Sequence, residues 1–139
     1  MTKGNRELKF RIWDGKKFLY NSHNSIYDRE HIYLNIDGSK YCRYGNQNYH
    51  LNLVVQQFTG LKDRNGKDIY EGDVLLYSLS YQEVATYGTN NDINEVIFES
   101  GSFKLLGGDL LSELVDYDGM TLREEIIGNI FENPDLISN

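Results

Sequence analysis

Residues 57–77 read QFTGLKDRNGKDIYEGDVLLY and hold the clearest structural signals of the chain. Their Asn65-Gly66 pair stands between two apolar segments, where Asn-Gly is the strongest short-range sign of a β-hairpin turn. Gly72-Asp73 then precedes the apolar run 74–77, which predicts a strand entered through a tight bend or bulge. This part of the chain therefore predicts a hairpin followed at once by another short strand.

The residues before this hairpin also favour short strands. Residues 50–58 predict a central strand, because apolar side chains occupy both of its faces. Residues 8–13 alternate between apolar and basic or aromatic side chains, and Asp14-Gly15 predicts a two-residue turn leading to a strand at 18–20. The Tyr/Asn-rich residues 21–48 predict loops that join brief strands.

The residues after the hairpin continue this pattern. Residues 80–92 predict a loop, and Ser100-Gly101 predicts a second hairpin between 95–98 and 103–106. Residues 109–117 predict a short helix capped by Asp109 or Ser112, with four apolar residues on one face, and 125–131 predict a last strand. Short strands at such regular spacing are typical of a small barrel. The predicted fold is thus mainly β, with a small barrel, additional N-terminal strands and one short helix near 109–117.

Length and composition predict one soluble domain. The 139 residues are 40% hydrophobic, which is enough for a single core. Cys42 is the only cysteine, so we expect neither a disulfide nor a zinc site of paired cysteines. A single cysteine predicts that the protein works in a reducing cytoplasm. The first residues contain no signal-peptide core, and no segment approaches the roughly 20 apolar residues of a membrane span.

Charge is distributed unevenly along the chain. The formal net charge of −7 argues against unspecific binding to nucleic acid. Residues 1–20 hold six Lys or Arg against two acids, whereas residues 92–139 hold eleven acids against Lys104 and Arg123. The two ends either attract one another within the protein, or one of them serves a charged partner.

A search for chemistry predicts no catalytic, cofactor or metal site. The acids of 63–73 could act as the paired carboxylates of a hydrolase or as ligands of Ca²⁺ or Mg²⁺. The basic residues between them favour a solvated turn with local ion pairs instead. Those acids are Asp63, Asp68, Glu71 and Asp73. The histidines, His23, His31 and His50, stand in no metal or nucleophile motif, and no phosphate-binding glycine loop is present.

Two groups of residues are candidates for binding a partner. Lys9, Arg11 and Trp13 predict an aromatic and basic patch on the first strand, suited to a peptide or a single-stranded nucleic acid. Tyr41 and Tyr44 belong to the tyrosine-rich segment, where aromatic faces can stack on a ligand. Packing in the core or at a subunit interface is the alternative for Trp13. For the tyrosines the alternative is packing in the core or at its rim.

Three blocks of the sequence resemble the signature of YopX proteins in order and spacing. They are KFRIWD at 9–14, QFTGLKDRNGKDIYEGDV at 57–74 and IGNIFENPDL at 127–136. The resemblance runs from about Lys9 to Leu136 and leaves out 21–49 and 80–92. It implies a small protein of temperate phages and prophages of Gram-positive bacteria, with an SH3-like barrel and no established activity.

The functional expectation is a phage accessory protein that is not an enzyme. It is a single YopX-like domain over 1–139, with N-terminal strands and loops in 1–49 and a barrel-like part in 50–136. It works in the host cytoplasm without cofactor or membrane, binds a host or phage protein, and is able to form homo-oligomers that cover open strand edges. The alternatives are an acidic nucleic-acid mimic formed by 92–139 and a nucleic-acid-binding barrel that uses the basic first strand.

Overall fold

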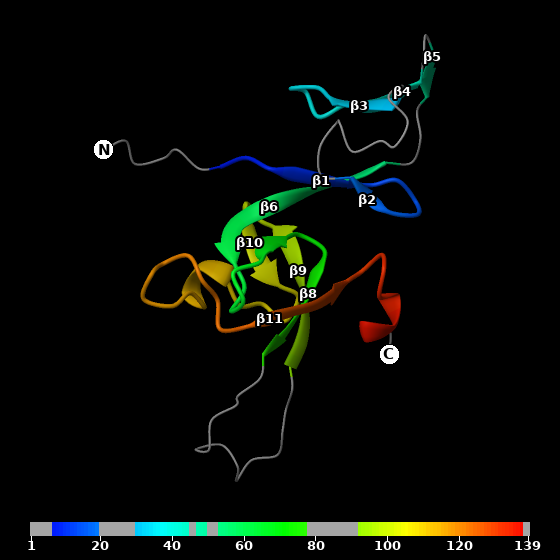
Figure 1. Cartoon of the computed structure of the whole chain (residues 1–139). Coiled ribbons are helices and arrows are strands. Elements are labelled where there is room, and N and C mark those ends of the chain that lie inside the picture. The colour runs from blue at the N-terminus through cyan, green and yellow to red at the C-terminus, as the bar shows by residue number, and fades with distance from the viewer. Residues whose placement is uncertain (1–6, 20–29, 45–46, 50–52, 78–91, 138–139) are drawn as a thin grey trace, which may run out of the picture. The chain divides into compact units, whose positions relative to one another are not determined.

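The computed structural model describes residues 7–19, 30–44, 47–49, 53–77 and 92–137 (Figure 1). The chain is mainly β, as predicted, and it divides into two compact units. The smaller unit is Lys9–Gln57, and the larger unit is Met1–Leu8 with Phe58–Asn139. The boundary lies inside strand β6 (Val54–Lys62).

The larger unit contains a four-stranded antiparallel sheet in the order β10-β9-β8-β11. Its strands are β8 (Asp73–Tyr77), β9 (Asp92–Glu99), β10 (Ser102–Leu105) and β11 (Glu125–Asn129). The sheet curls into a half-barrel, which agrees with the predicted small barrel.

The end of β6 pairs with β7 (Asp68–Tyr70) and also with the segment that leads into β11. Leu122 N donates to Lys62 O at 2.8 Å, and Arg64 N donates to Glu124 O at 2.9 Å. Because residues 122–124 continue directly into β11, these bonds tie the β6–β7 hairpin to the curled sheet.

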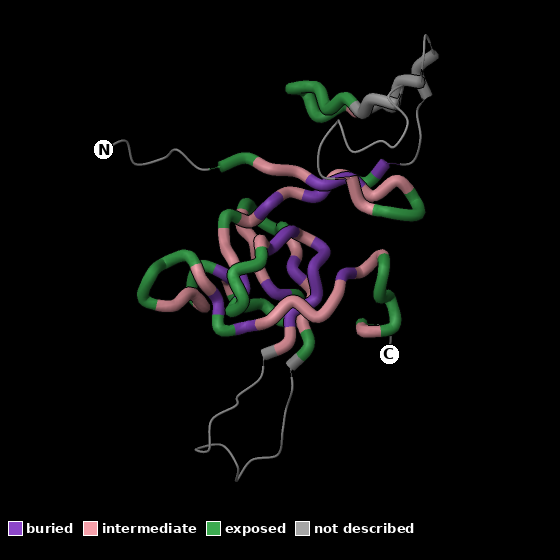
Figure 2. Tube along the Cα trace, viewed as in Figure 1, coloured by how far each residue is buried: buried purple, intermediate pink, exposed green. Residues whose placement is uncertain are grey.

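An apolar core lies within the described part of the larger unit. Its buried members come from strands and connecting segments alike: Ile69, Leu75, Val96, Leu105, Leu111 and Leu122. Figure 2 shows the buried stretches of the chain in purple. Each fully buried side chain of this size contributes about 1.5–3 kcal/mol relative to an exposed one.

Both predicted hairpins of the larger unit are confirmed. Between β6 and β7, Asp63 N donates to Lys67 O at 2.8 Å, and Gly66 adopts a φ of 82°. Between β9 and β10, Ser100 and Gly101 have φ values of 53° and 81°, the positive pair that a two-residue type I′ turn requires. The bend before β8 is confirmed as well, since Gly72 has a φ of 85°.

The smaller unit contains two sets of strands. Strand β1 (Phe10–Trp13) pairs with β2 (Phe18–Leu19) on one side and with Val54–Gln57 of β6 on the other. A separate antiparallel sheet has the order β3-β4-β5 and consists of β3 (Glu30–Leu34), β4 (Lys40–Tyr44) and β5 (Gln47–Tyr49).

The turn between β1 and β2 is longer than predicted. Trp13 pairs with Phe18, so four residues rather than two form the loop. The Asp14 Oδ1 atom accepts hydrogen bonds from Lys16 N at 2.7 Å and Lys17 N at 2.8 Å. This side chain holds the wider loop in place, because an aspartate can bond the backbone two and three residues ahead of it.

The predicted short helix is present only as one 3₁₀ turn, η2 (Leu111–Glu113), and no side chain caps it. Its neighbours on both sides form isolated β-bridges instead: Leu110 pairs with Lys104, and Val115 pairs with Leu122. These bridges place the flanking residues in extended conformation, so the helix does not extend over 109–117, and neither Asp109 nor Ser112 acts as a cap.

The last predicted strand ends two residues early, because Asn129 turns the chain. β11 has a register shift between Ile126 and Gly128, after which Asn129 Oδ1 accepts hydrogen bonds from Phe131 N at 3.0 Å and Glu132 N at 2.8 Å. The chain then forms a further 3₁₀ turn, η3 (Pro134–Leu136).

Candidate functional site

Arg11 of the predicted N-terminal patch is buried in the structure, at 4% exposure. Its Nε donates to Gln56 Oε1 at 2.8 Å, and its guanidinium carbon lies 4.2 Å from the centre of the Phe18 ring. A guanidinium over an aromatic face is a favourable cation–π contact. Arg11 thus joins β1 to both of its neighbouring strands.

Trp13 shares the Phe18 contact with Arg11. The Trp13 and Phe18 rings are 4.9 Å apart at an interplanar angle of 59°, and both Trp13 and Lys9 are half-buried. Tyr41 and Tyr44 lie in β4, in the separate sheet, and their side chains are outside what the structure describes. The structure therefore brings Arg11 and Trp13 together, and partner binding by the five predicted residues stays a prediction.

Two acids of the predicted solvated turn are buried instead. The Asp63 residue is 1% exposed, and its carboxylate accepts hydrogen bonds from Asn65 N, Lys67 N and Ile126 N at 2.9, 2.9 and 3.0 Å. Asp73 is buried as well, and its Oδ2 accepts a hydrogen bond from Tyr70 N at 2.8 Å across the bend at Gly72. Both carboxylates hold backbone turns, because buried N–H groups require acceptors.

Lys62 and Asp68 form the kind of local ion pair that was predicted for this turn, with 3.9 Å between Nζ and Oδ1. Among the described residues, no group of three or more His, Cys, Asp and Glu could hold a metal ion. Cys42 and His31 lie in β4 and β3, and His23 and His50 fall outside the described ranges. No helix in the part of the chain that the structure describes is long and apolar enough to cross a membrane.

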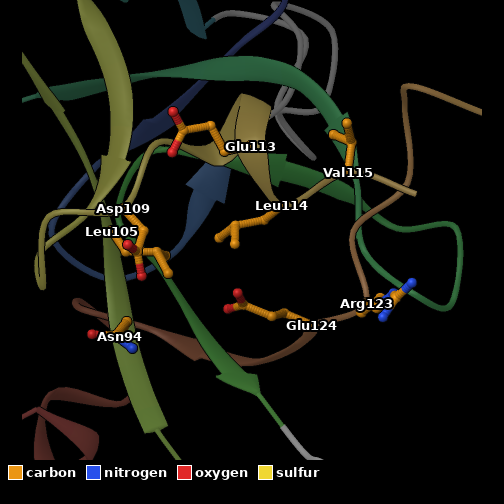
Figure 3. Close-up of a pocket in the computed structure, with 8 residues that line it drawn as sticks. All are labelled: Asn94, Leu105, Asp109, Glu113, Leu114, Val115, Arg123 and Glu124. Carbon is orange, nitrogen blue, oxygen red and sulfur yellow. The ribbon is translucent and has the colours of Figure 1, made fainter. Parts of the chain in front are cut away.

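A cavity of about 440 Å³ opens within the larger unit (Figure 3). Strands β9 and β10, the η2 turn with its flanks, and the segment before β11 supply its lining: Asn94, Leu105, Asp109, Glu113, Leu114, Val115, Arg123 and Glu124. Its volume lies in the range of about 300–1,000 Å³ that is typical of ligand sites.

The lining of this cavity combines an apolar wall with three carboxylates. Leu105, Leu114 and Val115 supply the wall, whereas Asp109 and Glu113 are exposed acids. Glu124 is 3% exposed, its Oε2 is shielded from solvent, and Figure 3 shows its carboxylate directed into the cavity toward Leu114.

Arg123 is the one guanidinium of the lining. Its Nε binds Asp116 Oδ1 at 2.9 Å, and its side chain turns away from the centre of the cavity (Figure 3). The charged groups of the lining are therefore three carboxylates and one guanidinium.

The sequence held one signal for this cavity. Leu122, Glu124 and Ile126 occupy alternate positions, which places a carboxylate among the residues of one strand face that points toward the core. Burying a charged side chain costs free energy, so a carboxylate at such a position indicates a polar site in the interior. The other lining residues come together only in the folded chain.

Residues 116–121 form a tight loop beside the cavity, called here the Tyr117 loop. Asp116 N donates to Thr121 O at 2.7 Å, Gly119 N donates to Asp116 O at 2.9 Å, and Gly119 has a φ of 69°. Tyr117 is fully exposed, and Met120 is also exposed. The Val115–Leu122 bridge closes the base of the loop, and Val115 also lines the cavity.

Asp118 organises the Tyr117 loop from within. Its Oδ1 accepts hydrogen bonds from Met120 N and Thr121 N, both at 2.8 Å, and its Oδ2 accepts one from Thr121 Oγ1 at 2.6 Å. The Thr121 hydroxyl, followed by these backbone donors, lowers the pKa of Asp118 because hydrogen bonds favour its charged form. The loop therefore presents two apolar side chains on a fixed backbone.

Comparisons with known proteins place this architecture in a family. The model of the family described as YopX protein matches residues 9–138. The crystal structure of protein EF1440 from Enterococcus faecalis is similar to this chain, with a TM-score of 0.59 and 28% sequence identity over 96% of this chain and 100% of that one. No curated protein sequence matches closely enough to count as a relative. Because the family model covers nearly the whole chain, this protein belongs to the YopX family.

Proposed function

We propose that this protein is a non-enzymatic binding module that recognises a protein partner through the Tyr117 loop. The observation that carries this proposal is the complete exposure of Tyr117 on a loop held by the hydrogen bonds of Asp118. Tyr and Met are enriched at protein interfaces, and tyrosines are frequent among the residues that dominate binding energy.

The fixed backbone of the loop supports the same proposal. Binding orders flexible side chains and loops at a cost in free energy, and a loop that is already ordered avoids part of that cost. The Asp116–Arg123 ion pair and the Thr121–Asp118 hydrogen bond both fix the loop before any partner arrives. In this function the protein serves as an accessory factor of a phage or prophage in the host cytoplasm, as its family resemblance led us to expect.

Affinity capture with matched variants tests the proposal. Tagged wild-type protein, Tyr117→Ala and Tyr33→Ala are each incubated with lysate of a Gram-positive bacterium at low and high salt, and bound proteins are identified. Tyr33 is the control because it is an exposed tyrosine of the smaller unit.

The expected result is a protein that wild type and Tyr33→Ala retain at high salt and that Tyr117→Ala loses by about tenfold or more, the loss that a hot-spot tyrosine produces. If Tyr117→Ala retains the same proteins as wild type, the loop is not the binding surface and the proposal is wrong.

A further inference from the structure

We propose that the cavity receives the side chain of an arginine from the protein partner, an inference that rests on the binding function proposed above. The cavity and the Tyr117 loop share one hairpin, because Val115 lines the cavity and pairs with Leu122 at the base of the loop. A partner that covers Tyr117 therefore lies within reach of the cavity with its neighbouring side chains.

The apolar wall suits the stem of a long side chain. Leu105, Leu114 and Val115 offer aliphatic surface, and Figure 3 shows the Leu114 side chain projecting into the space that the other residues surround. Arginine and lysine bury their methylene stems against such surfaces while their charged ends reach polar groups. A short or purely apolar side chain would bring no charge to the carboxylates of the lining.

The carboxylates select a cation over a neutral or anionic group. Asp109 and Glu113 stand at exposed positions of the lining, while Glu124 is directed into the cavity from the opposite segment (Figure 3). Because Glu124 is only 3% exposed, its attraction to an entering cation is screened less than that of a surface carboxylate.

Arginine fits this arrangement better than lysine. The carboxylates come from separate segments, before η2, within η2 and before β11. A guanidinium carries five N–H donors spread over a plane, so it can meet acceptors that approach from different sides. It is also more weakly hydrated than an ammonium group and therefore enters a partly apolar cavity more readily.

A titration of the full chain with small probes tests this inference. Backbone amide signals of ¹⁵N-labelled protein are followed by NMR during addition of N-acetyl-arginine methylamide, its lysine analogue or its citrulline analogue. Citrulline has nearly the shape of arginine but no charge. We expect saturable shifts at Leu114, Val115 and Glu124 with arginine, and binding of citrulline that is about tenfold weaker because charge-assisted hydrogen bonds are lost.

Variants assign the effect to the cavity. Glu113→Gln removes one exposed carboxylate of the lining, and Glu99→Gln removes an exposed carboxylate at the β9–β10 turn, outside the lining. We expect Glu113→Gln to weaken arginine binding several-fold and Glu99→Gln to leave it unchanged. Equal binding of arginine and citrulline, tighter binding of lysine, or shifts spread over acids outside the lining would overturn the inference.

The titration and the capture experiment test the two proposals separately, so either proposal can be wrong while the other stands. If Tyr117→Ala abolishes capture but arginine and citrulline bind the cavity alike, the protein remains a binding module and only the arginine inference falls. If arginine binds the cavity selectively but Tyr117→Ala captures its partners normally, the cavity binds a cation and the loop proposal is wrong.

Discussion

At the scale of single residues, Asp63 connects a local turn to a distant strand through one carboxylate. Its Oδ1 fixes the β6–β7 loop by accepting hydrogen bonds from Asn65 N and Lys67 N, and its Oδ2 accepts one from Ile126 N of β11. Because the residue is 1% exposed, water has little access to this carboxylate. The sequence predicted that Asp63 lies in a solvated turn, but its buried side chain joins that turn to β11.

Removing this carboxylate should destabilise the protein strongly. We expect Asp63→Ala to lower the free energy of unfolding by about 3 kcal/mol, because three backbone donors lose a charged acceptor in a buried place. Urea denaturation measures the change, with Asp135→Ala as the control, since exposed surface substitutions usually alter stability by less than about 0.5 kcal/mol. A similarly small loss for both variants would contradict the role assigned to Asp63.

Asp118 should make the Tyr117 loop sensitive to acid. Its pKa is lowered from the ordinary 3.8, so its hydrogen bonds contribute stability above pH 3.8 and lose that contribution as pH falls through the lowered value. NMR of the carboxyl carbon should show Asp118 titrating below pH 3.8, together with shifts of the Met120 and Thr121 amides. Titration at or above 3.8 would mean that the loop is not held in this way in solution.

At the scale of elements, turn residues located the hairpins, although Asp14-Gly15 predicted a two-residue loop where four residues form it. Helical periodicity predicted its element wrongly. Asn65-Gly66 and Ser100-Gly101 predicted their hairpins because the positive φ values, found at Gly66, Ser100 and Gly101, depend mainly on local sterics. The apolar spacing of 109–117 predicted a helix, but bridges of Leu110 to Lys104 and of Val115 to Leu122 determined the outcome. Those partners lie elsewhere in the chain, so no local pattern could reveal them.

Gly128 shows why the block IGNIFENPDL contains a glycine where a strand is predicted. A Cβ atom on residue 128 would lie 2.5 Å from Asn133 Oδ1 and 2.8 Å from Leu136 Cδ1. The close approach of the C-terminal turn to β11 therefore requires a residue without a side chain.

We accordingly expect Gly128→Ala to destabilise the protein by about 1–3 kcal/mol through overpacking. Thermal unfolding of Gly128→Ala, Asn133→Ala and the double variant measures the coupling between the two positions. The double variant should lose less stability than the sum of the single losses, because Asn133→Ala removes the nearest clashing atom. Strict additivity would show that Asn133 is not the cause.

At the scale of the whole molecule, the strand pattern was predictable from sequence, but the cavity was not. Its lining comes from β9, β10, η2 and the segment before β11, whose mutual positions depend on how the sheet curls. Only Glu124, an acid among alternating apolar residues, indicated that something polar is buried there. For the predicted N-terminal patch, the alternation of residues placed Arg11 on one face of a strand. It could not show that the Arg11 guanidinium contacts the Phe18 ring.

The two units should also differ in their local stability. Six buried apolar residues form the core of the larger unit, whereas Ile12 and Leu53 are the buried pair described for the smaller one. Because opening free energy follows buried contacts, amides of Leu75 and Val96 should exchange with solvent at least about tenfold more slowly than those of Ile12 and Val55. Hydrogen exchange followed by NMR measures this, and equal protection would mean that both units open in one step.

Strand β6 has a practical consequence for anyone who wishes to produce either unit as a separate fragment. Its residues 54–57 pair with β1, and Phe58 and Lys62 pair with β7, so the unit boundary falls between two consecutive residues of one strand. Multidomain chains are usually divided at exposed linkers where few contacts cross. Here a cut at the boundary would leave each fragment with a frayed half-strand and an open edge prone to aggregation, so a usable fragment of either unit must carry the whole of β6.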